Sequence, residues 1–317
     1  MDIYAVILAR AVDAPKVVPQ YYCSGTGLPA TIEVRENGKK VTRKLFPWRG
    51  TTPTFTWSYV EPVLPKKGNY SNQIEWGRTE YAKLKYDLAP ISGVGNVWHI
   101  SVGGKVGVRR YTVKATFIQG KTRYTVNAPD HTVRRDTVGD NGISDNVMRV
   151  VVKGDYPKNI FLQWVSSFQE VPFILGSNGE YQVDQYIGTD CADLVAGALR
   201  KMGKKVSYSG WYADGLYEMA KKGNYFSVVT PKTKNIKSIP EPQPGDIVLW
   251  DWDETDDPED FDHTTVYESG GNLSPGVLDK DDISIAASGG AKKVARISFK
   301  GCFEMPARSI GVIRLKP

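Results

Sequence analysis

The segment Gly188-Thr189-Asp190-Cys191-Ala192-Asp193-Leu194-Val195 decides the fold expected for the C-terminal half of this 317-residue chain. Apolar residues continue from it at helical spacing up to Gly203, which predicts an amphipathic helix over 191–202. Cys191 then opens that helix, where the positive end of the helix dipole favours a thiolate. The Cys191 backbone N–H is also available to an oxyanion formed at an attacked carbonyl. We therefore predict a nucleophilic cysteine at a helix start.

A nucleophilic cysteine needs a base close to it, and imidazole is the usual one because its pKa lies near neutral pH. The chain has three histidines. His99 and His131 fall in the N-terminal half, so His263 is the only candidate in the C-terminal half. We predict that Cys191 and His263 form a catalytic pair, since such residues meet in space rather than in sequence.

The pattern of the chain changes near Gly154 to Pro157. Before that point, short β-branched or aromatic runs alternate with turn residues, at 30–34, 54–59, 107–117, 122–126 and 147–152, which indicates a sandwich or small barrel. After it, helices are expected at 161–168, 191–202 and 211–221, followed by strands at 246–250, 263–268, 283–287, 293–299 and 309–315. The prediction is a β-rich accessory domain over 1–155 and an α+β domain over 156–317.

Four motifs occur in the order typical of one family. They are Val171-Pro172-Phe173-Ile174-Leu175-Gly176, Asp190-Cys191-Ala192-Asp193-Leu194, Pro244-Gly245-Asp246-Ile247-Val248 and His263. Together they resemble the NlpC-type cell-wall endopeptidases, a bacterial branch of the papain-like cysteine peptidases. The resemblance covers about residues 158–317. It implies a papain-like domain, with helices packed on an antiparallel sheet, preceded by an all-β sandwich-like or barrel-like domain.

The resemblance also implies roles for individual residues. Cys191 would be the nucleophile and His263 the general base and then acid. A polar residue on the next strand should orient the imidazole, but the closest alignment puts Ala286 there; Ser284 is the first substitute, and Asp281, Asp282 and Ser288 are weaker ones. Phe173 stands where the family tends to have Tyr, which Tyr181 or Tyr186 would replace. The candidates for substrate or oxyanion contact are Asp190, Phe173 and Tyr186.

The activity implied by the resemblance is hydrolysis of a peptidoglycan stem peptide through a thioester, with no metal or organic cofactor. Two alternatives stay open. One is an amidase or acyltransferase acting on another amide or ester, and the other is a non-catalytic binding or scaffold protein of the cell envelope. The peptidoglycan substrate implies an exported protein, located in the periplasm or at the extracellular side of the cell envelope. Met1 to Ala14 lack a signal peptide's pattern, so we expect the signal to have been removed.

The amino-acid composition limits the kinds of binding partner that we expect. The net charge of +6 and pI near 9.0 suit polyanions, but the basic residues form no nucleic-acid motif, so no nucleic-acid partner is expected. No stretch has the roughly 20 apolar residues of a membrane span. Tryptophans in the N-terminal half, such as Trp48, Trp57, Trp76 and Trp98, suit either glycan contact or core packing.

Two further features leave alternatives open. Cys23 and Cys302 can form a disulfide that leaves Cys191 free, or can both be buried thiols. The acidic run from Asp251 to Asp262 suits a solvated loop, a calcium loop, or a group of carboxylates that act on His263 or on a cationic substrate.

Overall fold

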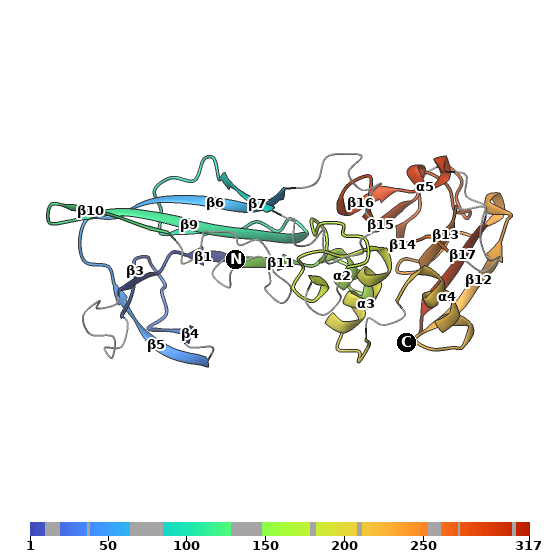
Figure 1. The fold of residues 1–317 in the computed structure, drawn as a ribbon, viewed down its shortest axis with the longest axis horizontal. Helices are drawn as coiled ribbons and strands as arrows, with labels where there is room; N and C mark the ends of the chain where they lie inside the picture. Colours follow the sequence, from blue (N-terminus) through green and yellow to red (C-terminus); the bar gives the residue numbers. More distant parts are fainter. Residues whose placement is uncertain are drawn as a thin grey trace.

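The computed structural model describes residues 1–9, 20–36, 39–63, 85–127, 148–177, 182–207, 211–252, 261–271, 273–305 and 309–317. Its two halves lie end to end along the long axis (Figure 1). The strands of the N-terminal half are β1 (Asp2–Tyr4), β2 (Ile7–Ala9), β3 (Gln20–Cys23), β4 (Thr31–Glu36), β5 (Lys39–Pro47), β6 (Thr54–Val63), β7 (Lys85–Pro90), β8 (His99–Ser101), β9 (Gly107–Gln119), β10 (Thr122–Asn127) and β11 (Met148–Val152).

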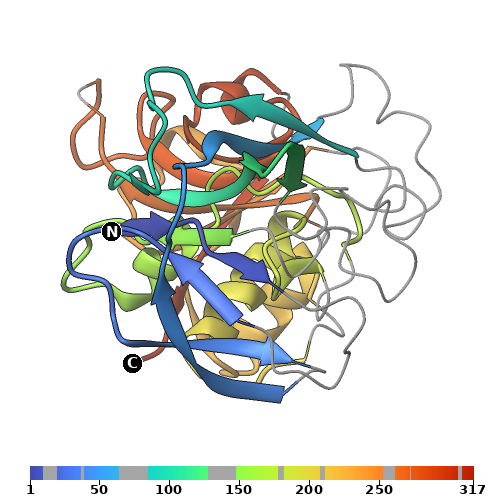
Figure 2. The same cartoon turned by 90° about the vertical axis from the view of Figure 1, so that its left-hand side faces the viewer.

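Three sheets share one core in the N-terminal half. The largest has the order β10-β9-β6-β7, with β11 also paired to β9, while β2-β3-β5-β4 and β1-β8 form the other two. Their buried side chains meet in a single cluster that includes Tyr21, Phe55, Trp57, Trp98 and Tyr111. Figure 2 shows these strands in front of the C-terminal half. Trp57 and Trp98 are therefore core residues, and Trp48 is only partly buried.

The C-terminal half contains one six-stranded sheet, in the order β12-β17-β13-β14-β15-β16, in which every neighbouring pair is antiparallel. Its elements are α2 (Ile160–Ser166), α3 (Cys191–Lys201), α4 (Ala213–Lys221), β12 (Phe226–Thr233), the 3₁₀ helix η2 (Ile236–Ser238), β13 (Ile247–Asp251), β14 (His263–Ser269), β15 (Ile283–Ser288), β16 (Lys293–Ser298), α5 (Lys300–Glu304) and β17 (Ser309–Leu315).

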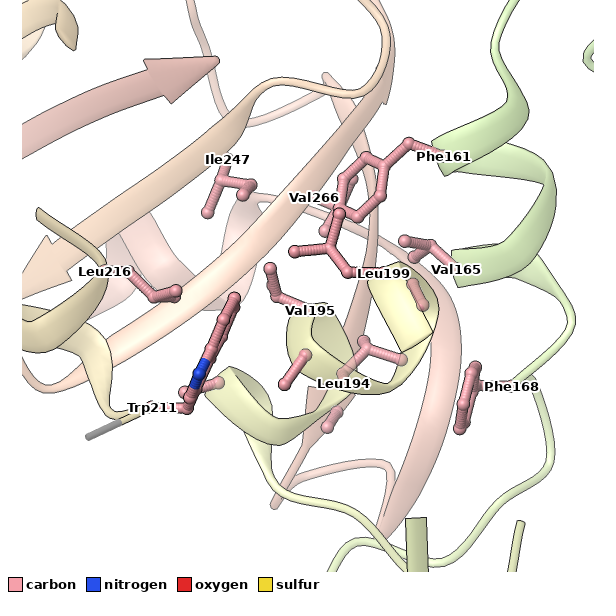
Figure 3. Close-up of a cluster of buried hydrophobic side chains, with 14 of the residues drawn as sticks. Phe161, Val165, Phe168, Leu194, Val195, Leu199, Trp211, Leu216, Ile247 and Val266 are labelled. Carbon is pink, nitrogen blue, oxygen red and sulfur yellow. The ribbon is translucent and has the colours of Figure 1, made fainter. Parts of the chain in front are cut away.

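The two faces of this sheet pack into different clusters. Leu194, Val195 and Leu199 of α3 pack with Val266 of β14 in one cluster, to which α2 and α4 also contribute (Figure 3). Tyr267, the next residue of β14, belongs to a second cluster that contains Trp250 and Phe299. Because successive side chains of a strand point to opposite faces, residues of β14 with even numbers face α3 and those with odd numbers face away from it.

The predicted fold class is wrong. Strands account for 43% of the structure and helices for 16%, and no papain-like pairing of helices with the sheet is evident, so the protein is mainly β. The described residues form seventeen strands and only four α-helices, none longer than the 11 residues of α3. Several strands have no regular alternation in sequence, and β12 was among those not predicted. The expected α+β class and papain-like domain therefore do not hold.

Backbone contacts join the two halves. The N–H of Val108, at the start of β9, donates to Gln169 O at 2.9 Å. Gly107 precedes it with φ of +108°, and a Cβ there would lie 2.5 Å from Gln169 O. Arg110 also donates from Nη2 to Tyr186 O at 2.5 Å. The segment after α2 is thus held against the N-terminal end of β9. This close approach requires glycine at position 107.

Gly197 lies in the middle of α3, where glycine normally weakens a helix relative to alanine. Here a Cβ would lie 2.5 Å from Val183 Cγ1 and 2.9 Å from Phe168 Cζ, both fully buried. We expect Gly197→Ala to lower the free energy of unfolding by about 1–3 kcal/mol, because overpacking outweighs the gain in helix propensity. Denaturant unfolding checks this prediction, and a variant that is more stable than the wild type contradicts it.

In the part of the chain that the structure describes, no helix has the length and apolar character needed to cross a bilayer.

Candidate active site

Cys191 is the first residue of α3, and Asp190 is the N-cap of that helix. The Asp190 carboxylate accepts the N–H of Asp193 at 2.8 Å, which satisfies one donor at the helix start. Cys191 is partly exposed, whereas Cys23 and Cys302 are buried, and all three are free thiols. The structure therefore has no Cys23–Cys302 disulfide, and Cys191 is the least buried of the three cysteines.

Thr264 of β14 lies near the Cys191 thiol. Its backbone N–H and its hydroxyl both lower the pKa of the thiol, as does the N–H of Ala192. The Thr264 hydroxyl is buried and has no hydrogen-bond partner among the described residues. Cys191 Sγ thus lies near N–H and O–H groups at the point where α3 meets β14.

Burial nevertheless dominates the titration of Cys191. Although the residue is partly exposed, the protein packed around Sγ disfavours the charged form, and the neighbouring Asp190 carboxylate adds to this, so the pKa rises to about 12. The donors from Thr264 and Ala192 offset only part of the rise. The helix-dipole argument predicted a lowered pKa, but desolvation is larger, so Cys191 is a neutral thiol at pH 7.

His263 begins β14 and lies on the other side of the sheet. Its ring stacks on Trp252, with centroids 5.3 Å apart and an interplanar angle of 23°. It pairs across the strands with Trp250, and alternation along β14 directs its side chain away from the face on which Thr264 meets Cys191. Both residues are described, and no hydrogen bond joins them. The structure therefore brings His263 next to Thr264 in the chain but not into contact with Cys191.

The His263 imidazole is neutral at pH 7. Burial disfavours its charged form and lowers its pKa to about 4. Together with the raised pKa of Cys191, this means that the resting site holds a thiol and a neutral imidazole. A thiolate–imidazolium ion pair is not the resting state.

The register of β15 separates Ser284 from His263. Ser284 pairs with Tyr267, four residues further along β14, which corresponds to about 13 Å. Its hydroxyl is buried and donates to Ile297 O at 3.4 Å. Extending the pairing from Val266–Ile285 places Ser288 opposite His263. The Ser288 hydroxyl accepts the N–H of Ala291 at 3.2 Å.

Asp281 and Asp282 lie near the opposite end of β15. The Asp282 carboxylate accepts the N–H groups of Gly271 and Asp279, at 2.6 and 3.0 Å. The N–H of Asp281 donates to Asp279 Oδ1 at 2.8 Å. These contacts organise the loop before β15, so neither carboxylate is placed to orient His263.

Phe173 and Tyr186 have different surroundings. Phe173 forms an isolated parallel bridge with Thr189, two residues before Cys191, and its ring packs against the core shared with α3. Tyr186 is buried near Phe168, with ring centroids 4.4 Å apart, and Lys201 Nζ lies 4.7 Å from its ring centroid. Lys201 ends α3, so Tyr186 lies at the far end of that helix and not at the thiol. Tyr181 lies outside the described residues.

Two carboxyl groups share a buried site beside Cys191. Asp190 accepts backbone N–H groups from Gly176, Ser177, Ala192 and Asp193, yet burial raises its pKa to about 6. Burial and the charge of Asp190 raise the pKa of Asp193 to about 8. The Ser177 hydroxyl donates to Asp193 Oδ2 at 2.5 Å. Asp190 is therefore an acceptor in a capping arrangement, not an oxyanion donor.

Sequence reasoning did not single out Thr264, Ser177 or Asp193. The Asp-x-x-Asp spacing of 190 and 193 is close to a capping box and was a usable signal for Asp193. Thr264 and Ser177 carry no comparable pattern, because their proximity to Cys191 depends on how β14 and the segment before α3 pack against the helix.

The acidic run falls mostly at residues 253–260, which lie outside the described part of the chain. Its described ends have protein partners: Asp251 pairs with Lys232 at 3.0 Å, and Asp262 accepts the N–H of Trp252 at 2.6 Å. Within the described ranges, no group of three or more His, Cys, Asp or Glu side chains is arranged to hold a metal ion.

Replacing Asp190 with asparagine tests the electrostatics of the thiol. Asparagine keeps the N-cap acceptor but removes the charge that raises the pKa of Cys191. We expect Asp190→Asn to speed alkylation of Cys191 by about two- to fivefold at pH 8, since a lower pKa gives more thiolate. The wild-type rate should keep rising up to pH 10 without a plateau. Alkylation of Cys302 is the internal control, and an unchanged or slower Cys191 rate contradicts the prediction.

Comparison with known proteins gives no match: neither a protein-family model, nor a curated protein, nor a solved structure is similar to this chain at a significant level. What the protein does therefore has to be inferred from Cys191 and its surroundings.

Proposed function

We propose that this protein is a cysteine-nucleophile amide hydrolase that cleaves the stem peptide of peptidoglycan. The observation that carries the proposal is the position of Cys191. It is a partly exposed thiol at the start of an 11-residue helix, beside the N–H and hydroxyl of Thr264, whereas the other two cysteines are buried. This arrangement supplies a nucleophile and donors for the charge that develops at an attacked carbonyl.

In the proposed reaction, Cys191 Sγ bonds to the carbonyl carbon of an amide while its proton passes to the neutral imidazole of His263. The imidazolium then gives that proton to the leaving nitrogen, so the C–N bond breaks and a thioester remains. Water, deprotonated by His263, attacks the thioester carbonyl, the C–S bond breaks, and the thiol is restored. No other co-reactant is needed.

This reaction requires His263 to leave its stack on Trp252. Its imidazole then has to pass the N-terminal end of β14 to the face of the sheet on which Cys191 lies. The imidazole is neutral at pH 7, so its lone pair is available, but burial makes it a weaker base than a solvated imidazole. Contacts between nucleophile and base are often looser without substrate and tighten in the substrate complex. Ser288, opposite His263 in the extended register, is the side chain we propose to orient it.

The substrate class rests on the ordered motifs at 171–176, 190–194, 244–248 and 263, which resemble those of NlpC-type cell-wall endopeptidases. A location in the cell envelope follows from that substrate. Glycan contact through the N-terminal half is a further part of the proposal. Since Trp57 and Trp98 are core residues, such contact has to use partly exposed aromatic residues such as Trp48.

Incubation with defined muropeptides, followed by mass measurement of the products, tests the proposal. We expect two fragments whose masses sum to the substrate plus one water, and none with Cys191→Ala. Cys302→Ala is the matched control, because Cys302 is a buried thiol remote from α3, and it should retain cleavage. Transfer of an acyl group to an added amine instead of water identifies an acyltransferase. If Cys191→Ala forms the same products as the wild type in the same amounts, the proposal is overturned.

The second candidate is a non-catalytic binding protein of the cell envelope. The observation that favours it is the separation of Cys191 from His263, together with a thiol pKa of about 12. This candidate predicts that muropeptides bind without being cleaved and that Cys191→Ala binds as tightly as the wild type. Cleavage that depends on Cys191 rules it out.

A further inference from the structure

A cleft lies where the two halves of the molecule meet. Its volume is about 270 Å³. The end of β6, the start of β9 and the loop before it contribute from the N-terminal half, and Glu170 and Lys293 contribute from the C-terminal half. The contact of Gly107 and Val108 with Gln169 fixes this arrangement, because the backbones touch there. The cleft is separate from the Cys191 site.

Positive charge predominates in the cleft. Lys105, Arg109, Arg110 and Lys293 line it, against the carboxylates of Glu61 and Glu170. Lys293 Nζ and Glu170 Oε2 form an ion pair at 2.7 Å, so they largely neutralise each other. Arg110 donates to Tyr186 O and so helps to join the halves. Lys105 and Arg109 are the other two cations that line the cleft, and the exposed Glu61 is the other carboxylate.

Arg109 carries a donor that needs an acceptor. Its Nε is buried and has no hydrogen-bond partner among the described residues. The guanidinium lies over the ring of Tyr59, 5.8 Å from the centroid, and this stacking limits where the charge can point. A buried N–H without an acceptor is unfavourable, and a guanidinium binds carboxylate and phosphate oxygens well. The cleft is thus lined by a guanidinium that lies over the Tyr59 ring and whose Nε has no acceptor among the described residues.

We propose that this cleft binds an oxyanion group, a carboxylate or a phosphate, of a small ligand. The Arg109 guanidinium pairs with the oxyanion, Lys105 adds a second positive charge, and the Tyr59 ring forms a wall. The volume admits a small ligand or one charged group of a larger one. The site is independent of the activity proposed for Cys191.

Calorimetric titration with inorganic phosphate and, separately, with succinate tests the site, at constant ionic strength set with sodium chloride. We expect saturable binding of at least one of the two anions by the full chain. Arg109→Gln keeps a polar side chain but removes the charge, and we expect it to weaken binding by at least about tenfold. Lys44→Gln is the matched control, because Lys44 lies over Phe46, outside the cleft, and it should bind like the wild type.

Lys105→Gln keeps the test decisive if Arg109→Gln fails to fold, since Lys105 is exposed in a loop. We expect it to weaken binding by about threefold. Binding of phosphate alone, or of succinate alone, supports the site and identifies the oxyanion. Binding of neither anion by the wild type, or equal binding by the wild type and both cleft variants, overturns the proposal. Cleavage of muropeptides by either variant is expected to be unchanged, which separates this site from the Cys191 chemistry.

Discussion

Replacing Cys191 with alanine is expected to lower the rate of amide cleavage by at least about a thousandfold, because no other group takes over from a missing nucleophile. Alanine removes only Sγ and leaves the N-cap of α3 at Asp190 in place. The melting temperature should therefore stay within a few degrees of the wild type. Rates of muropeptide cleavage and thermal unfolding, measured on the same preparations, check both parts.

His263→Ala should lose cleavage to a similar extent, since it removes the proposed base. His99→Ala is the matched control, because His99 stacks on Tyr4 in the N-terminal half, and it should keep the wild-type rate. If His263→Ala retains full activity, then His263 is not the base and the proposed reaction is wrong in that step.

Replacing Asp246 with alanine is expected to lower the free energy of unfolding by about 2–4 kcal/mol. The Asp246 carboxylate is buried and accepts from Arg314 Nε and Nη2, both at 2.7 Å. It also accepts the N–H of Gln243 at 2.8 Å, which closes the turn before β13. Truncation leaves all three donors without this partner. Urea unfolding of the variant and the wild type measures the difference.

Lys40→Ala is the matched control for Asp246→Ala. Lys40 pairs with Glu33 at 3.0 Å, but both side chains are more than two-thirds exposed. We expect its removal to change stability by less than about 1 kcal/mol, because exposed ion pairs contribute little. Equal losses from the two variants would show that burial of the Asp246 pair has no special effect.

Local structure was largely predictable from the sequence. The helix predicted over 191–202 is α3, Cys191–Lys201, and the strand predicted over 309–315 is β17, Ser309–Leu315. Both predictions are confirmed. The helical spacing of apolar residues in α3 ends before Gly203, and β17 is rich in β-branched residues, with its first five residues buried. β12 (Phe226–Thr233) was missed, because it includes a proline and its burial pattern does not alternate.

The fold class and the geometry of the site could not be read from the same patterns. Many strands are short or half-buried, so their share of the chain was underestimated and an α+β C-terminal domain was expected. The pairing of Cys191 with His263 was inferred from residue type, but the face on which His263 lies depends on the register of β14. The titration of Cys191 depends on desolvation, which only packing determines.

Site-resolved alkylation tests the central claim most directly. The full chain is treated with iodoacetamide at pH 7.5, and the modified fractions of Cys23, Cys191 and Cys302 are followed by peptide mass measurement. We predict that Cys191 reacts at least about tenfold faster than the two buried thiols, because it is the least buried of the three cysteines. A Cys191 that reacts as slowly as Cys23 and Cys302 would contradict the assignment of Cys191 as the nucleophile.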